Sequence, residues 1–240
     1  MIQKERKGFR ANRAWFMRCK AVVFDMDGVI FDSERLVLEG WTMIAEKYGF
    51  VGIEEVYYRC VGVNSALTKE IFLKHYGADF PYDTYKNECS ALFHSRYDGG
   101  RLPMKSGVTD LLSYLKEEKY LVGLASSTRQ AVVTREIKDA GLMEYFDNLT
   151  CGDMVKKSKP EPDIFLQACE SLGVLPEEVI TIEDSYNGIR AAYRAGTVPV
   201  MVPDMIQPDE EMKRLSCRIC KDLLEVREWF SDAVHNSRLL

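Results

Sequence analysis

A short apolar run near the start of the chain constrains the fold more than any other feature. Residues 21–24 read Ala-Val-Val-Phe and stand between Lys20 and Asp25. Four apolar residues in a row, bounded by charged ones, are typical of a strand that is buried on both faces of a parallel sheet. Such a strand delivers its last residue to the carboxyl edge of the sheet, where open α/β proteins bind their ligands. We therefore expect an α/β fold with a functional site beside Asp25.

Two carboxylates leave this predicted strand, because Asp25 and Asp27 stand one residue apart on the turn that follows it. Gly28 behind them lets the chain turn sharply or lets a ligand approach the backbone. Paired acids in such a place can bind a divalent cation, divide nucleophilic and proton-transfer roles between them, or do both. A solvated acidic turn after an ordinary strand is the alternative, and these residues alone leave it open.

The pattern changes to helical after Asp32. Apolar residues recur at three- and four-residue spacing from residue 33 to Gly49, and nothing from residue 33 to residue 98 alternates like a strand. Glycines and a proline punctuate this segment. It predicts a helical insertion, with helices over residues 33–48, Ile53–Cys60, Ser65–Tyr76 and Asp83–Tyr97.

Strands and helices alternate regularly from Leu102 onward. The predicted strands are Tyr120–Ala125, Asn148–Cys151, Val179–Glu183 and Val198–Val202. The predicted helices are Val108–Lys119, Gln130–Ala140, Asp163–Leu172, Gly188–Ala195 and Asp222–Phe230. Parallel strands joined by helices in this order predict a doubly wound, Rossmann-like sheet. The expected organisation is a tail over residues 1–18, an α/β core over residues 19–32 and 100–240, and the helical insertion over residues 33–99.

Composition excludes several classes of function. The 46% apolar content supports a hydrophobic core, and the net charge of -5 argues against a nucleic-acid surface. No uncharged run approaches the ~18 apolar residues that cross a bilayer. Seven cysteines without framework spacing predict reduced thiols in a cytoplasmic protein, and the single pair Cys217 and Cys220 favours packing over metal or redox use. We expect a monomer with no nucleic-acid or membrane partner.

The first residues of the chain are basic and lack the apolar stretch of a secretory signal. We expect a tail that is disordered or loosely docked. Met17 stands just before the first predicted strand, and our hypothesis is that it is the natural start of the protein. Mass spectrometry of the native protein would test this.

The predicted strand ends share a chemistry. The first strand ends at Asp25, the second runs into Ser126-Ser127-Thr128, and the fourth ends at Glu183-Asp184. The topology gathers these ends along one edge of the sheet. Two acid clusters with hydroxyl groups between them can assemble a site for Mg²⁺ and phosphate, because Mg²⁺ takes carboxylate oxygens together with phosphate oxygens. Ser126 and the backbone N–H groups after it can donate hydrogen bonds to the phosphate.

Lys159 is a further candidate, in a polar loop before the predicted helix that starts at Asp163. Pro160 biases the backbone of Lys159 towards an extended conformation, which could aim its side chain at the site. A solvated loop lysine is the alternative, and it would be preferred if the other motifs were absent.

Four segments together bring a family into view: Asp25-Met26-Asp27-Gly28-Val29, Leu124-Ala125-Ser126, Ser158-Lys159-Pro160-x-Pro162-Asp163 and Glu183-Asp184-Ser185-x-x-Gly188. They resemble the four ordered motifs of the haloacid dehalogenase superfamily, over roughly residues 20–202. Each motif alone is common, but all four in this order are highly specific. The helical insertion resembles the four-helix cap of the subfamily that includes β-phosphoglucomutase and many small sugar-phosphate phosphatases, and we call it the cap.

The resemblance implies a mechanism for phosphoryl transfer. Asp25 would attack phosphorus and become an aspartyl phosphate, and Asp27 would protonate the leaving oxygen and then deprotonate a water molecule. Ser126 would hydrogen-bond the phosphoryl group, and Lys159 would offset the negative charge. The implied phosphate-binding residues are Met26, Ser126, Ser127 and Lys159.

The same resemblance implies Mg²⁺ as the cofactor. The ion would be held by a carboxylate oxygen of Asp25, the main-chain carbonyl of Asp27 and the carboxylate of Asp184. Glu183 would be a further ligand or a partner of the ligands, because many relatives have a non-acidic residue at its position.

Three functions remain open, and the resemblance favours a phosphatase acting on a small phosphate monoester. Asp27 counts against dehalogenase and phosphonatase chemistry, because those relatives lack an aspartate there. Mutase-like relatives carry a cap histidine twelve residues after the nucleophile, where this chain has Val37. They also carry an arginine shortly after the cap-loop glycine, where this chain has Gly62-Val63-Asn64-Ser65. The alternatives are a β-phosphoglucomutase-type mutase and a non-catalytic protein that binds a phosphorylated metabolite.

Substrate choice is expected to reside in the cap, which would close over the core. In the turn Val61–Ser65 we expect Gly62 and Asn64 to contact the substrate, a small phosphorylated metabolite. His75 and His94 have no spacing that suggests a metal site, and we assign them no role. Five cations could reach a second anionic group, although helix-surface cations are usually solvated: Arg59, Lys69, Lys74, Lys86 and Arg96.

Overall fold

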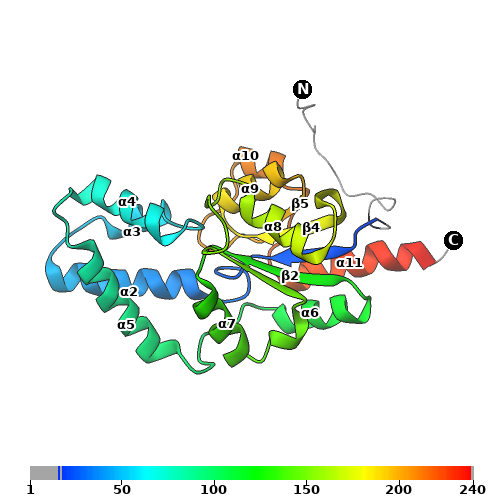
Figure 1. Ribbon diagram of the computed structural model, residues 1–240, viewed down its shortest axis with the longest axis horizontal. Helices are drawn as coiled ribbons and strands as arrows, with labels where there is room; N and C mark the ends of the chain where they lie inside the picture. Colours follow the sequence, from blue (N-terminus) through cyan, green and yellow to red (C-terminus); the bar gives the residue numbers. More distant parts are fainter. Residues whose placement is uncertain (1–15, 17, 239–240) are drawn as a thin grey trace.

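The structure, a computed structural model, describes residue 16 and residues 18–238 of the 240-residue chain, with side chains described up to residue 233. Most of the predicted tail over residues 1–18, including Met17, therefore lies outside the described residues. Figure 1 shows two parts side by side, with the helices of the cap on the left and the sheet with its covering helices on the right.

The described residues form one six-stranded parallel sheet, in the order β3-β2-β1-β4-β5-β6. Its strands are β1 (Ala21–Phe24), β2 (Leu121–Ser126), β3 (Asn148–Cys151), β4 (Val179–Glu183), β5 (Val198–Met201) and β6 (Arg218–Ile219). Strand β1 lies between β2 and β4, with Phe24 opposite Leu124 and Ile182. The strand order reverses at β1, so the switch point lies where Asp25 leaves the sheet. The predicted fold class is confirmed.

Helices cover both faces of the sheet. They are α6 (Val108–Glu117), α7 (Gln130–Asp139), α8 (Asp163–Leu172), α9 (Tyr186–Ala195), α10 (Glu210–Leu215) and α11 (Leu223–Arg238), with short 3-10 turns at Met143–Tyr145 and Pro176–Glu178. Side chains of β1 alternate between the two layers: Val22 and Phe24 pack with α6, α7 and α11, and Ala21 and Val23 pack with α8 and α9. Figure 1 shows α8 and α9 above the sheet and α6 and α7 below it. Burial on both faces explains why β1 is apolar throughout.

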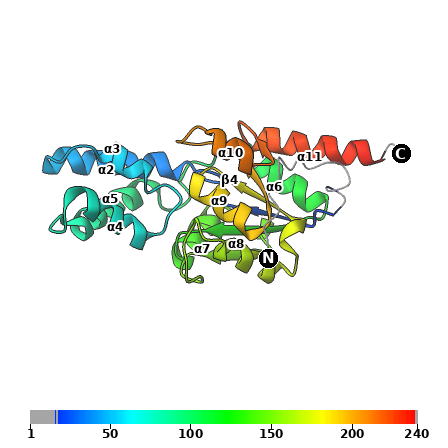
Figure 2. The same ribbon diagram turned by 90° about the horizontal axis from the view of Figure 1, so that it is seen from above.

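The cap consists of α2 (Ser33–Tyr48), α3 (Ile53–Tyr58), α4 (Ser65–Tyr76) and α5 (Tyr82–Tyr97), close to the predicted ranges. It has an aromatic core of its own, in which the rings of Trp41 and Phe72 lie 4.6 Å apart and those of Phe72 and Tyr82 lie 5.1 Å apart. Figure 2, seen from above, shows the cap extending from one end of the core, away from α11. The cap therefore stands beyond the sheet edge at which the strands end.

Strand β6, helix α10 and the two short 3-10 turns were not predicted. Each has six residues or fewer, which is too short to give a recognisable hydrophobic period. Helix α10 has a polar start instead, because the side chain of Asp209 accepts a hydrogen bond from the backbone of Met212 at 2.8 Å. Strand β6 extends the sheet by two residues at its edge and does not affect the site.

Two further features concern the cysteines and the length of the helices. All seven cysteines are described, and none forms a disulfide. Cys220 is buried beside the sheet, in agreement with a packing role for the Cys217 and Cys220 pair. Among the described helices, none combines the length and the apolar character needed to cross a bilayer.

Candidate active site

The carboxyl ends of β1 and β4 bring three carboxylates together. Asp25 leaves β1, and Glu183 and Asp184 stand at the end of β4. One carboxylate oxygen from each of the three lies within 4.8 Å of the others. All three side chains are buried. The acids of two separate strands thus share one small space, as the topology predicts.

Lys159 reaches this space from the loop before α8. Its ammonium donates hydrogen bonds to Oδ1 of Asp25 at 2.5 Å and to Oε1 of Glu183 at 2.6 Å. The side chain is only 1% exposed, so it is not a solvated loop lysine. Burial alone would lower the pKa of Lys159, but the charges of Asp25 and Glu183 outweigh burial and raise its pKa above the usual value. The ammonium therefore stays charged beside Asp25.

The acids exceed the available positive charge. Burial raises the pKa of Asp184 well above its usual value, and the charges of Glu183 and Asp25 add to that shift. Burial also raises the pKa of Asp25, although the ammonium of Lys159 opposes the effect. Buried carboxylates under such repulsion are relieved by a bound cation.

The backbone at Gly28 is shaped around one of these acids. Gly28 has a φ of +82°, and a Cβ built there would lie 2.4 Å from Oδ2 of Asp184. Only glycine lets the carboxylate approach the turn after β1 so closely. The donor set consists of hard carboxylate oxygens at a tight turn, and it fits Mg²⁺.

Asp27 is held by two hydroxyl groups. Ser33 donates a hydrogen bond to Oδ1 of Asp27 at 2.6 Å, and Thr128 donates one to Oδ2 at 3.0 Å. Asp27 and Thr128 line the same cavity as Asp25. From the sequence, Thr128 was placed in the hydroxyl cluster at the end of the second strand but was given no role of its own, and Ser33 was not singled out. The placement of Thr128 at the end of a strand-end hydroxyl cluster was the available signal.

The remaining predicted phosphate-binding residues differ in how deeply their side chains are buried. The hydroxyl of Ser126 is buried and accepts a hydrogen bond from the backbone N–H of Thr128 at 3.0 Å. Ser127 lines the cavity and donates to the carbonyl of Gly62 at 3.3 Å. The side chain of Met26 is fully buried, so only its backbone can face a phosphate.

The cap loop lies directly against the core. Gly62 has a φ of +76°, and a Cβ built there would lie 2.3 Å from Oγ of Ser185. The backbone N–H of Asn64 donates to the hydroxyl of Ser158 at 3.1 Å. The side chain of Asn64 is used elsewhere, because its Oδ1 accepts a hydrogen bond from the backbone of Leu67 at the start of α4. Gly62 lines the cavity, and substrate contact by Asn64 stays a prediction.

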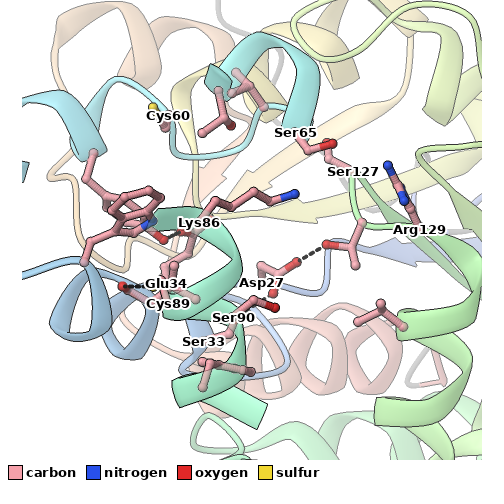
Figure 3. A pocket seen from close by; sticks show the side chains of 18 of the residues that line it. Asp27, Ser33, Glu34, Cys60, Ser65, Lys86, Cys89, Ser90, Ser127 and Arg129 are labelled. Carbon is pink, nitrogen blue, oxygen red and sulfur yellow. Dashed lines mark hydrogen bonds between the residues drawn. The ribbon is translucent and has the colours of Figure 1, made fainter. Parts of the chain in front are cut away.

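A cavity of about 470 Å³ lies between the cap and the core. Figure 3 shows Asp27, Ser127 and Arg129 on its core side and Glu34, Lys86 and Ser90 on its cap side. Lys86 of α5 extends across the cavity in this view. Of the five predicted candidate cations, Lys86 is the one that lines the cavity, and Arg129 is a cation that sequence reasoning missed.

Two further acids line the cavity, and sequence reasoning assigned a role to neither. Tyr57 donates a hydrogen bond to Oε2 of Glu34 at 2.5 Å, and burial raises the pKa of Glu34 to about 7. Burial also raises the pKa of Glu136, on α7, to about 8. The sequence does not show that these two acids are buried, because their burial depends on how the cap sits on the core.

Comparison with known proteins gives the family. The chain matches the family model of haloacid dehalogenase-like hydrolases over residues 22–202. It is 34% identical over 177 residues to the phosphorylated carbohydrates phosphatase of Thermotoga maritima, with 74% of this chain and 82% of that protein covered. It is 31% identical over 191 residues to the β-phosphoglucomutase of Bacillus subtilis, with 76% of this chain and 83% of that protein covered.

A solved structure is also similar to this chain. The crystal structure of CbbY from Rhodobacter sphaeroides in complex with phosphate has a TM-score of 0.73 and 27% sequence identity, and the match covers 87% of this chain and 96% of that one. The family match includes β1 from its second residue on, the cap and β4, and hence every residue of the acid cluster. This chain therefore belongs to the haloacid dehalogenase-like hydrolases.

Proposed function

We propose that this protein is a Mg²⁺-dependent phosphatase that hydrolyses a small phosphate monoester, a sugar phosphate or a similar metabolite, through an aspartyl phosphate on Asp25. The observation that carries the proposal is the contact between Asp25 and the buried ammonium of Lys159, at 2.5 Å. The acids Glu183 and Asp184 lie beside this contact. A phosphate monoester repels a carboxylate, and this arrangement supplies the positive charge that lets the two approach.

We assign the cation to particular groups of this donor set as part of the proposal. A carboxylate oxygen of Asp25, the carboxylate of Asp184 and the main-chain carbonyl of Asp27 would hold Mg²⁺. When bound, the ion neutralises phosphate charge and orients the phosphoryl group. Glu183 fits a supporting role, because Oε1 accepts from Lys159 and Oε2 accepts from Ser185 at 2.9 and 3.0 Å.

The side chains then divide the chemistry. Oδ of Asp25 attacks phosphorus, and the bond from phosphorus to the alcohol oxygen breaks. Asp27 gives its proton to that oxygen, later takes a proton from the attacking water, and so restores free Asp25 and releases phosphate. Ser33 and Thr128 hold the carboxyl of Asp27 in place during both steps.

The similarity to a β-phosphoglucomutase supports mutase chemistry as the second candidate. Val37 lines the cavity at the position where mutase-like relatives carry a histidine, and its side chain cannot transfer a proton. Hydrolysis is therefore preferred. A non-catalytic binding protein would have no need for Asp27, whose two oxygens both accept hydrogen bonds.

We also propose a cytoplasmic location. The absence of any disulfide among the seven cysteines supports it.

The test is phosphate release from a panel of sugar phosphates, nucleotides and phosphoglycolate, with Mg²⁺ and with a chelator. We expect release that the chelator abolishes and that the Asp25→Asn variant loses. A mutase would instead interconvert sugar phosphates when primed with a bisphosphate. An Asp25→Asn variant that releases phosphate at the parent rate would contradict the proposal.

A further inference from the structure

Two contacts from the same part of the chain hold Lys159, one at its side chain and one at the backbone next to it. Strand β4 ends at Glu183, whose Oε1 accepts a hydrogen bond from the ammonium of Lys159 at 2.6 Å. Helix α9 follows β4, and Nη1 of Arg194, in the last turn of this helix, donates a hydrogen bond to the main-chain carbonyl of Pro160 at 2.9 Å. Pro160 directly follows Lys159 in the chain. Only the first of these contacts has a part in the proposed mechanism.

The loop that carries Lys159 lies between β3 and α8. Residues 156–157 are exposed, whereas the side chain of Lys159 is 1% exposed. The N–H of Glu161 donates to the carbonyl of Ser158 at 3.0 Å, so the buried lysine lies within a tight turn. Taking an ammonium out of water costs free energy, and its ion pairs offset that cost only while their geometry is kept. The position of the turn therefore decides how well the lysine is placed.

Helix α9 is a firm base for the contact with this turn. It begins directly after the acids of β4, where the hydroxyl of Ser185 accepts a hydrogen bond from the N–H of Gly188 at 3.0 Å. Three of its alanines are buried in one cluster with residues of β1 and α8. Figure 1 shows α8 and α9 together above the sheet. Arg194 therefore extends from a part of the core that is fixed relative to Asp25.

Arg194 also has a second partner on the loop. Its Nη1 lies 3.2 Å from Oε1 of Glu161, and both side chains are 46% exposed. An ion pair as exposed as this one contributes little to stability. The hydrogen bond to the carbonyl of Pro160 acts on the backbone itself, and the charge of the guanidinium strengthens it. The carbonyl contact is therefore the one that can fix the loop.

We propose that Arg194 is a positioning residue that keeps Lys159 beside Asp25 by holding the backbone of the Lys159 loop. Arg194 does not line the cavity, so its effect on catalysis passes through this loop. The inference rests on the proposed function, in which Lys159 offsets the negative charge of the nucleophile and of the phosphate. The competing explanation is that Arg194 only stabilises the fold, and the test separates the two.

The experiment compares four variants of the full chain. Arg194→Gln removes the charged donor, Arg194→Lys keeps one, and Glu161→Gln removes only the ion pair. The matched control is Arg190→Gln, one turn earlier on the same helix, where the arginine pairs with Glu211 of α10 instead.

Two independent measurements are made on each variant. Kinetics of p-nitrophenyl phosphate hydrolysis at saturating Mg²⁺ give kcat and KM. Limited digestion with trypsin, followed by mass spectrometry, gives the rate of cleavage after the exposed lysines of residues 156–157 without any turnover. Thermal unfolding reports whether each variant is folded.

We expect Arg194→Gln to lower kcat by about tenfold and to leave KM within about 3-fold of the parent value, because a displaced Lys159 offsets less charge during phosphoryl transfer. Trypsin should cut the loop of this variant faster, because the loop opens more often. Arg194→Lys should recover part of both losses. Glu161→Gln and Arg190→Gln should match the parent in kinetics and in cleavage.

Three outcomes would overturn the inference: a parent-like kcat in Arg194→Gln, a lower kcat without faster cleavage of the loop, or equal losses of kcat in Arg194→Gln and Arg190→Gln. The third would make the effect a general one of α9. A parent protein that releases no phosphate would remove the proposed function and with it the catalytic part of the inference. Cleavage by trypsin would still decide whether Arg194 holds the loop, so the two failures are distinguishable.

Discussion

Oε1 of Glu183 lies 2.6 Å from the ammonium of Lys159. The same ammonium contacts Asp25, so Glu183 holds the lysine against the proposed nucleophile. The other oxygen of Glu183 accepts two hydrogen bonds from Ser185. The carboxylate of Asp184, in contrast, packs against Gly28 at the turn after β1. We therefore infer different roles for the two neighbouring acids: Glu183 positions Lys159, and Asp184 is a proposed Mg²⁺ ligand.

Substitution should separate these tasks. Asp184→Asn should weaken Mg²⁺ binding by about tenfold or more, because the proposed direct ligand loses its charge. Glu183→Gln should lower kcat by about 10- to 100-fold through the misplaced Lys159, as is typical when a supporting partner is removed. Its Mg²⁺ affinity should fall less than that of Asp184→Asn, because the proposed ligands Asp25 and Asp184 are both kept. Calorimetric titration with Mg²⁺ measures the first quantity without turnover, and equal losses of affinity in both variants would contradict the assignment.

The hydroxyl of Thr128 gives a second prediction, because it fixes one oxygen of Asp27 at 3.0 Å. Thr128→Val keeps the shape of the side chain and removes the donor. We expect kcat to fall by about tenfold with little change in KM, because an Asp27 that Ser33 alone still holds is less well placed for the proposed proton transfer. Thr109→Val, at an exposed position on α6, is the matched control. A raised KM with unchanged kcat would show that Thr128 contacts substrate instead.

Close contact between the cap loop and the core gives a third prediction. Gly62 and Gly49 have similar backbone angles, with φ of +76° and +73°. A Cβ at Gly62 would collide with Ser185, whereas one at Gly49 would meet nothing within 4 Å. Both alanine variants should lose about 1 kcal/mol of stability from the strained backbone. Gly62→Ala alone should also raise KM severalfold, because the cap loop cannot seat on the core. Identical kinetics in the two variants would disprove a role for this contact.

Much of the acidic edge of the sheet was predictable from the sequence. Asp25 and Glu183 end apolar strands, and parallel topology places such ends along one edge. The position of Lys159 was harder to predict, because the bias from Pro160 fixes only the local backbone. Its burial follows from two acids that are distant in sequence.

The cap side of the cavity was not predictable to the same degree. Glu34 reads as an ordinary first-turn acid of an amphipathic helix, and nothing local indicates its contact with Tyr57. That pair depends on how α3 folds back over α2 and on how both sit over the core. Asn64 illustrates the same limit, because a polar residue in the cap loop suggests substrate contact while its side chain caps α4. Tertiary placement decides such roles, and periodicity carries no information about it.

Glu136 lies on the core wall of the cavity, and its side chain is 11% exposed. Burial raises its pKa from 4.5 to about 8, the charge of Asp27 adds to the shift, and Arg135, 3.9 Å away, opposes it. The folded protein therefore binds the proton of Glu136 more tightly than the unfolded chain does. Between pH 4.5 and about 8 the folded state carries the additional proton, so the free energy of unfolding falls as the pH rises through this window.

Glu136→Gln should remove this dependence, because the amide does not ionise. We expect the variant to gain stability relative to the parent as the pH rises from 5 to 8.5, by on the order of 2 to 4 kcal/mol. Urea unfolding at both pH values measures the difference. Subtracting the parent from the variant cancels the contributions of Glu34 and of the acids at the proposed Mg²⁺ site, because these groups titrate in both proteins. Glu144→Gln, at an exposed position, should show no such gain. A Glu136→Gln variant whose advantage stays constant with pH would mean that Glu136 is already ionised in the folded protein at pH 5.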